Sequence, residues 1–135
     1  MSANRMRGAA DATPTVLVVD DEQMIRWSIE QTLRVAGYEV VTAETGAEGL
    51  ALVRQLDPDV VLLDLRLPDE DGLNLLKRIK EGSRPETAVI VMTAFGGAYA
   101  PAEALRMGAL AYLAKPFDFD KLQALVEKAL EAKPA

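Results

Sequence analysis

The chain has 135 residues, of which 50% are hydrophobic and 27% charged, a balance typical of one soluble domain. Asp and Glu number 21 against 15 Lys and Arg, and the net charge of −6 argues against a nucleic-acid-binding surface. The sequence contains neither Cys nor His, which excludes disulfides, thiolate nucleophiles, imidazole bases and Cys- or His-ligated metals. Any chemistry must therefore rely on carboxylates, hydroxyls, Lys and backbone amides, with a hard cation where one is needed.

Five short apolar runs are spaced along the chain, and each predicts a β-strand. They cover residues 16–19, 38–43, 60–63, 89–92 and 111–114. Runs that are apolar on both faces are typical of a parallel sheet covered by helices on each side. All are far shorter than the roughly 20 residues of a membrane span. Because the first residues also lack the apolar core of a signal peptide, we expect a cytoplasmic protein.

The segments between the strands carry the apolar periodicity of helices. We expect helices over residues 23–36, 47–56, 72–80, 101–107 and 118–132. Gly37 is a natural helix stop, Pro101 suits a first helical position, and Asp118 suits a cap. The alternation predicts an α/β protein with a single doubly wound (βα)₅ domain over residues 14–132. Residues 1–13 are expected to form a disordered tail, and residues 133–135 a frayed end.

Polar side chains follow four of the five strands at their carboxyl ends. In chain order they are Asp20 and Asp21 with Glu22 just beyond, then Asp64, Thr93 and Lys115. Ligands of open parallel sheets bind at this edge, so these groups are expected to meet there. Neighbouring carboxylates repel one another unless a cation lies between them, and Mg²⁺ prefers oxygen ligands. The sequence therefore predicts a Mg²⁺ site with open positions for a phosphoryl group.

Asp64 is the candidate nucleophile, because a carboxylate can accept a phosphoryl group as an aspartyl-phosphate. Mg²⁺, the Lys115 amine and the Thr93 hydroxyl can all stabilise the charge of the transferring group. Since the chain has no His, a phosphohistidine donor would have to belong to a partner.

Four segments of the chain resemble the receiver domain of two-component response regulators. They are VLVVDDE, VVLLDLRLPDEDGL, VIVMTAFG and GALAYLAKPF, and the likeness covers roughly residues 14–131. The segments MIRWSIEQTL and YLAKPFDFDKL further resemble receivers of the nitrogen-regulation type, which precede sigma-54-dependent activator domains. The resemblance implies a flavodoxin-like sheet of strand order 2-1-3-4-5.

The resemblance also implies roles for the acidic cluster. Asp64 would be the phosphoacceptor. Asp21 and Asp64 would bind Mg²⁺ directly with the backbone carbonyl of Arg66, and Asp20 would act through a metal-bound water. Lys115 would pair with the phosphoryl group or with Asp64.

Further roles are implied around the acceptor. Thr93 would hydrogen-bond a phosphoryl oxygen, and the small Ala94 beside it would contact the phosphoryl group through its backbone. Tyr112 would be a switch aromatic that turns inward as Thr93 moves. The bond before Pro116 would be cis, as is common at this point in the family. Arg66 and Phe95, both bulky, would shield the phosphoryl group and slow its hydrolysis.

The implied phosphoryl donor is a sensor histidine kinase or a phosphotransfer protein. Phosphorylation would switch the surface formed by helix 4 (residues 101–107), strand 5 (111–114) and helix 5 (118–132), and this surface would control an output or partner. A homodimer formed through the same surface is a further expectation. Met24 and Trp27 lie off the core stripe of the first helix and are expected to contribute to kinase docking. Direct binding of nucleic acid or membrane is not expected. Residues 95–100 contain two Gly and are expected to be mobile.

The residues favour a phosphorylation-dependent signalling domain, which would catalyse only its own phosphorylation and dephosphorylation, over three other functions. An interaction module that works without phosphate would not need the full acidic set. A haloacid-dehalogenase-type phosphatase would need a second Asp where this chain has Arg66. A flavodoxin-like FMN carrier would need a Ser-, Thr- and Gly-rich loop where residues 20–22 are acidic and repel phosphate.

Overall fold

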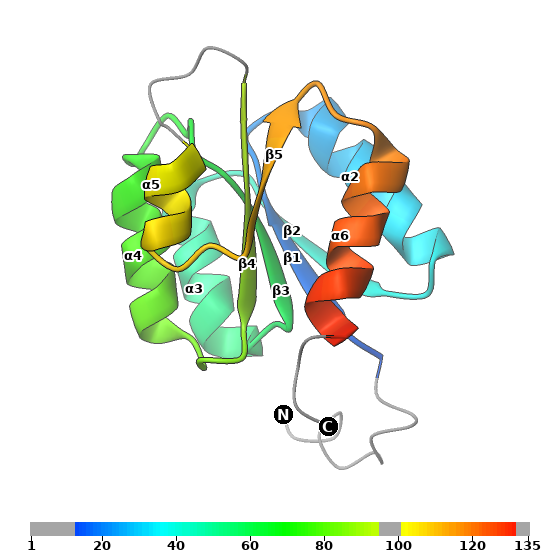
Figure 1. Cartoon of the computed structure of the whole chain (residues 1–135), viewed down its shortest axis with the longest axis horizontal. Coiled ribbons are helices and arrows are strands. Elements are labelled where there is room, and N and C mark those ends of the chain that lie inside the picture. The colour runs from blue at the N-terminus through cyan, green and yellow to red at the C-terminus, as the bar shows by residue number, and fades with distance from the viewer. Residues whose placement is uncertain (1–12, 95–100, 132–135) are drawn as a thin grey trace.

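The computed structural model describes residues 13–94 and 101–131, which form alternating strands and helices (Figure 1). In chain order these are β1 (Thr15–Val19), α2 (Gln23–Val35), β2 (Glu39–Ala43), α3 (Gly46–Leu56), β3 (Val60–Asp64), α4 (Gly72–Gly82), β4 (Ala88–Ala94), α5 (Pro101–Arg106), β5 (Ala111–Lys115) and α6 (Phe119–Glu131). Each expected element is present. The segments predicted as a tail, a frayed end and a mobile loop lie outside the described residues, except for Thr13.

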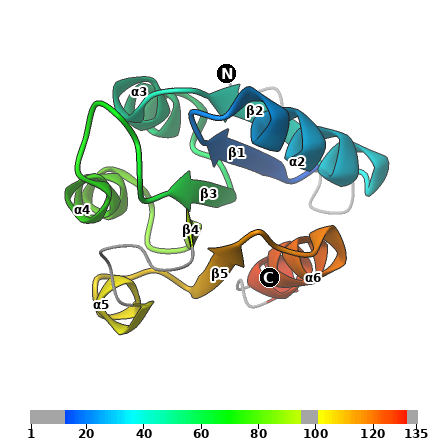
Figure 2. The same ribbon diagram turned by 90° about the horizontal axis from the view of Figure 1, so that it is seen from above.

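The strands form one parallel sheet of order β2-β1-β3-β4-β5, as predicted. Helices α3, α4 and α5 cover one face, and α2 and α6 cover the other (Figure 2). Because successive side chains of a strand point to opposite faces, each strand contributes to both hydrophobic cores. In β3, Val61 and Leu63 pack on the α3 side, while Val60 and Leu62 pack on the α2 side. The alternation of apolar strands with amphipathic helices therefore produces a three-layer domain.

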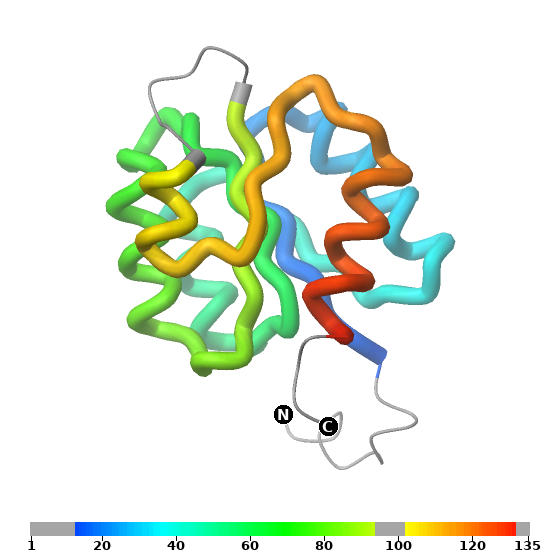
Figure 3. The backbone as a smooth tube through the Cα atoms, in the orientation of Figure 1, coloured from blue at the N-terminus to red at the C-terminus, as the bar shows by residue number. Residues whose placement is uncertain are grey.

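The parallel arrangement brings the carboxyl ends of all the strands to one edge. In Figure 3 the backbone enters β1 at the lower edge and leaves each strand at the upper one. Asp64 pairs with Met92 in the sheet register, and Ala94 pairs with Lys115. The strand-end residues of β1, β3, β4 and β5 therefore lie beside one another.

Side-chain caps fix where several helices begin. Thr45 Oγ1 accepts a hydrogen bond from Glu48 N at the start of α3, at 3.1 Å. Asp71 Oδ2 accepts one from Asn74 N at the start of α4, at 3.2 Å, and Asp118 caps α6 through Asp120 N. Within the described ranges, the helices are all too short or too polar to cross a bilayer.

Candidate functional site at the carboxyl edge of the sheet

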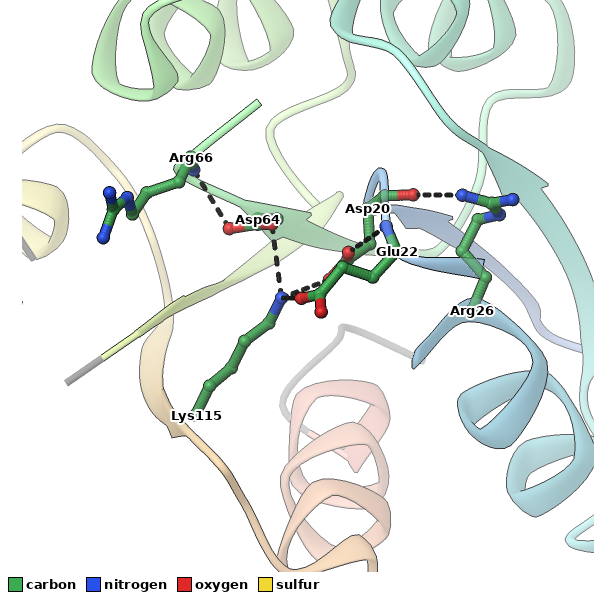
Figure 4. A network of polar contacts seen from close by, with 6 residues as sticks. All are labelled: Asp20, Glu22, Arg26, Asp64, Arg66 and Lys115. Atoms are coloured by element: carbon green, nitrogen blue, oxygen red, sulfur yellow. Dashed lines mark hydrogen bonds and ion pairs between the residues drawn. The ribbon is translucent and has the colours of Figure 1, made fainter. Parts of the chain in front are cut away.

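Two of the predicted carboxylates are buried at the ends of central strands. Asp20 follows β1 with no exposed surface, and Asp64 ends β3 with 3% exposed. Each is oriented by a backbone amide two residues further on. Glu22 N donates to Asp20 Oδ1 at 2.9 Å, and Arg66 N donates to Asp64 Oδ1 at 3.0 Å. The other oxygen of each carboxylate is thereby turned toward the space between the strands (Figure 4).

Lys115 occupies that space from the end of β5 (Figure 4). Its Nζ donates to Asp20 Oδ2 at 2.6 Å and to Asp64 Oδ2 at 3.2 Å, and reaches the exposed Glu22 Oε1 at 3.1 Å. All three ammonium protons thus have carboxylate acceptors. The Lys115–Pro116 peptide bond is cis. The ammonium group bridges carboxylates on two strands that are far apart in the sequence.

Burial and charge oppose each other in this cluster. Burial raises the pKa of Asp20 and of Asp64, and the contacts with Lys115 only partly offset it. Burial alone would lower the pKa of Lys115, but the hydrogen bond and charge of Asp20 and the charge of Asp64 outweigh it. The pKa of Lys115 is therefore raised, and the side chain stays cationic at neutral pH. Lys115 thus acts together with the backbone amides of Glu22 and Arg66, and these contacts compensate in part for the desolvation of the two carboxylates.

Thr93 lies in β4 with 1% of its surface exposed, one residue beyond the partner of Asp64 in the sheet register. Among the described residues, its Oγ1 is the buried side-chain oxygen or nitrogen that lacks a hydrogen-bond partner. Buried hydroxyls are normally paired, so this oxygen suits a ligand that brings its own acceptor or donor. Ala94 stands opposite Lys115 in the register.

Tyr112 is placed differently from the rest of the predicted set. It lies in β5 and is partly buried against the hydrophobic cluster that α3, α4 and α5 make with the sheet. It does not line the pocket at the strand ends. Tyr112 therefore lies on the expected strand and is partly buried. The switch role of Tyr112 stays a prediction.

The carboxylates fit a hard divalent cation. Oxygen atoms of Asp20, Asp21 and Asp64 lie within 4.8 Å of one another, and Asp21 is exposed. Mg²⁺ prefers oxygen donors, and a solvent-facing carboxylate suits an ion that keeps several of its waters. Beside them opens a pocket of about 260 Å³ lined by Asp21, Glu22, Asp64, Arg66 and Lys115. This space is large enough to admit a phosphoryl group.

Two contacts of the site were not anticipated from the sequence. The Glu22 carboxylate shares Lys115 with the buried pair. Arg26, one turn into α2, donates through Nη1 to the backbone oxygen of Asp20 at 2.8 Å (Figure 4). Its Nη2 also lies 3.5 Å from Glu44 Oε2. The acidic run over residues 20–22 was the available signal for Glu22. Arg26 on the amphipathic α2 carried none, because an arginine there is usually solvated.

The family model for the response regulator receiver domain matches residues 16–127. The chain belongs to this family. The receiver is 48% identical over 115 residues to the DNA-binding transcriptional regulator NtrC of Escherichia coli (strain K12), a match that covers 85% of this chain and 24% of NtrC. It is 43% identical over 125 residues to the transcriptional regulatory protein ZraR of Salmonella typhimurium, covering 93% of this chain and 27% of ZraR. It thus spans about a quarter of these curated relatives.

Solved structures agree with the assignment. The receiver domain of NtrX from Brucella abortus superposes with a TM-score of 0.81 at 37% identity, covering 87% of this chain and 99% of that one. A CheY-like receiver domain protein from Methanospirillum hungatei JF-1 gives 0.80 at 35% identity, covering 88% and 95%. The predicted likeness to receivers of nitrogen-regulation and sigma-54 activator type is confirmed. Receivers are signalling domains, which sets aside the phosphatase and flavin-carrier alternatives, and the family binds Mg²⁺ at such an Asp cluster.

Proposed function

We propose that this receiver takes a phosphoryl group from a histidine kinase or phosphotransfer protein onto Asp64, with Mg²⁺, and thereby switches an output. The observation that carries the proposal is the environment of Asp64. The carboxylate is almost fully buried, one oxygen is held by Arg66 N, and the other faces the Lys115 ammonium. A carboxylate in that setting is oriented for attack and has a cation ready for the charge that arrives.

The transfer step would run in line. A carboxylate oxygen of Asp64 attacks the phosphorus of a phosphohistidine, a P–O bond forms, and the P–N bond breaks. The electron pair of the broken bond stays on the imidazole nitrogen of the donor, which takes up a proton. The product is an acyl phosphate on Asp64. Hydrolysis by water later releases inorganic phosphate and restores the carboxylate.

Each neighbouring residue has a proposed part in this step. Asp21, Asp64 and the Arg66 carbonyl would hold Mg²⁺, with Asp20 acting through a bound water, and the ion would neutralise charge on the phosphoryl oxygens. Lys115 would keep its protons and donate one hydrogen bond to a phosphoryl oxygen. The unpartnered Thr93 Oγ1 and the backbone of Ala94 would contact the phosphoryl group. We propose that Thr93 passes this contact on to Tyr112 as a population shift.

Two exposed apolar surfaces suit the proposed partners. On α2, Met24 is 69% exposed and Trp27 55%, which supports docking of the phosphoryl donor beside the acidic edge. On the opposite layer, Leu105 of α5 and Leu110 before β5 are 45% and 48% exposed. They support the α5–β5–α6 face, which corresponds to the expected helix 4, strand 5 and helix 5, as the surface that contacts an output domain, a partner or a second copy.

Phosphorylation by acetyl phosphate tests the proposed function without knowledge of the kinase. With Mg²⁺, wild type is expected to gain a single phosphoryl group, detected by intact-mass spectrometry. Asp64→Asn is expected to gain none, because an amide oxygen is too weak a nucleophile to form the acyl phosphate. Omitting Mg²⁺ should likewise abolish the adduct.

Asp59→Asn is a suitable control, because Asp59 pairs with Arg84 and Thr15 N away from the site. It should be phosphorylated like wild type. A folded wild-type protein that binds Mg²⁺ but forms neither this adduct nor a beryllium fluoride complex would contradict the proposal. It would favour an interaction module that works without phosphate.

Arg66 is expected to prolong the life of the phosphoryl group. Its side chain is exposed and lines the pocket two residues after Asp64, where it can exclude attacking water. Arg66→Ala should therefore shorten the phosphoryl half-life about two- to tenfold, measured as the decay of the phosphorylated mass. The same half-life in both proteins would make the shielding hypothesis wrong. Phe95, the other bulky residue of this prediction, lies outside the described residues.

A further inference from the structure

We infer that Asp69 is a positioning residue for the phosphorylation site, which acts by tethering the β3–α4 loop to the first turn of α3. The loop, residues 65–71, follows Asp64 directly and contains Arg66. The inference rests on the proposed function, because the loop matters for transfer only if Asp64 and the Arg66 backbone form the site.

The tether consists of two hydrogen bonds across 22 and 23 residues of sequence. Gly46 N donates to Asp69 Oδ1 at 2.9 Å, and Ala47 N donates to Asp69 Oδ2 at 3.2 Å. The first amides of a helix have no partner within the helix, and the positive end of its dipole favours an anion. These bonds hold the pKa of Asp69 below its ordinary value, so the carboxylate is ionised at neutral pH. The first turn of α3 therefore receives its hydrogen-bond acceptor from the β3–α4 loop, and these bonds hold the loop against the helix.

The packing at Gly46 shows how closely the loop approaches. A Cβ on Gly46 would lie 3.0 Å from Leu75 Cδ2, 3.1 Å from Glu70 Cβ and 3.4 Å from Asp69 Oδ1. These contacts are tighter than ordinary, so a side chain at this position would require the loop or Leu75 to move slightly away from the helix. In Figure 2 the loop from β3 to α4 passes beside α3.

The same loop is also fixed on its other side. Glu70 Oε1 accepts from Arg78 Nη1 at 2.7 Å and from Asn74 Nδ2 at 3.0 Å, both on α4. An isolated antiparallel bridge pairs Arg66 with Asp71 and closes the loop on itself. Asp69 thus holds the loop to α3, while Glu70 holds it to α4.

The link to the site runs through Arg66. Its amide orients the acceptor by donating to Asp64 Oδ1 at 3.0 Å (Figure 4). Its carbonyl is the proposed backbone ligand of Mg²⁺. Both groups belong to the backbone of the tethered loop, and Arg66 lies three residues before Asp69, so backbone motion gained at Asp69 would reach the groups that orient Asp64. Outer partners that orient ligands in this way commonly influence metal affinity.

Three variants separate this role from a general loss of stability. Asp69→Ala removes both bonds of the tether, and Asp69→Asn leaves one acceptor oxygen. Thr45→Ala removes a different cap of the same helix, the Oγ1 that accepts from Glu48 N, and leaves the loop tethered. Each folded variant is measured for hydrogen exchange of the Arg66 amide, for Mg²⁺ affinity by calorimetry and for phosphorylation by acetyl phosphate.

We expect Asp69→Ala to accelerate exchange at Arg66 and to weaken Mg²⁺ binding roughly three- to tenfold, with a slower phosphorylation. Asp69→Asn should fall between Asp69→Ala and wild type, and Thr45→Ala should change thermal stability without changing exchange at Arg66. The inference is overturned if Asp69→Ala alters stability alone, or if Thr45→Ala weakens Mg²⁺ binding equally. If wild type accepts no phosphoryl group, the proposed function fails, while exchange and Mg²⁺ affinity still decide the tether.

Discussion

Gly72→Ala is expected to destabilise the receiver by about 3 kcal/mol or more. Gly72 is the first residue of α4, and a Cβ there would lie 2.1 Å from the carbonyl oxygen and 2.5 Å from the Cα of Leu65. Both atoms are backbone, so no side chain can rotate away, and the chain itself has to move. Urea and thermal denaturation followed by circular dichroism would measure the loss.

Gly82→Ala on the same helix is the matched control. A Cβ on Gly82 would meet only the Arg54 side chain, at 3.5 Å, which is an ordinary contact. Since Ala loses less backbone entropy than Gly in a helix, this variant should be neutral or stabilised by up to about 1 kcal/mol. Equal stability of the two variants would contradict the prediction. Because Leu65 follows Asp64, folded Gly72→Ala protein should also bind Mg²⁺ more weakly.

The fold could be predicted because local signals and tertiary packing agree. Apolar runs such as Val60–Leu63 are too short and too uniformly apolar for surface helices, and a parallel sheet is what buries them on both faces. Residues that start or stop helices, namely Gly37, Pro101 and Asp118, predicted helix ends close to the observed ones. The exposure of Met24 and Trp27 also followed from helical periodicity, because they lie off the buried stripe of Ile29 and Leu33.

The candidate site could be predicted as a set of residues, since parallel strands bring their carboxyl ends to one edge whatever the side chains do. What strand order does not determine is which oxygen meets which donor. The sharing of Lys115 by Glu22, and the bond from Arg26 to the Asp20 backbone, depend on side-chain conformations. The tether from Asp69 to Gly46 joins a loop to the first turn of α3, and no periodic pattern in the loop predicts which of its residues meets the helix.

Lys115→Met is expected to reduce both stability and phosphorylation strongly. The side chain is 12% exposed and faces Asp20 and Asp64, whose side chains are 0% and 5% exposed. Removing one partner leaves uncompensated buried carboxylates, which costs roughly 3 kcal/mol. The phosphoryl group also loses a cationic donor, and about a hundredfold slower reaction with acetyl phosphate is expected. Chemical denaturation and the rate of mass gain measure the two effects, with the exposed Lys121→Met as control.

The pH dependence of the stability loss identifies its cause. The folded-state pKa values of Asp20 and Asp64 already lie above their unfolded values, and losing the Lys115 charge raises them further. The folded state then binds more protons than the unfolded state, so the variant regains stability as the pH falls through these raised values and loses it as the pH rises. Mg²⁺ should also restore stability, because it supplies positive charge to the same carboxylates.

A second substitution separates stability from chemistry. Lys115→Met leaves the buried carboxylates of Asp20 and Asp64 without a counter-ion. Adding Asp20→Asn removes one of these two negative charges, so the double variant should recover much of the lost stability at neutral pH. It should not recover phosphorylation, because the phosphoryl group still lacks its cationic donor and the proposed Mg²⁺ site has also lost the Asp20 charge. If the double variant regained both, Lys115 would act only as a counter-ion of the buried carboxylates. If Lys115→Met alone reacted at the wild-type rate, its proposed contact with the phosphoryl group would be wrong.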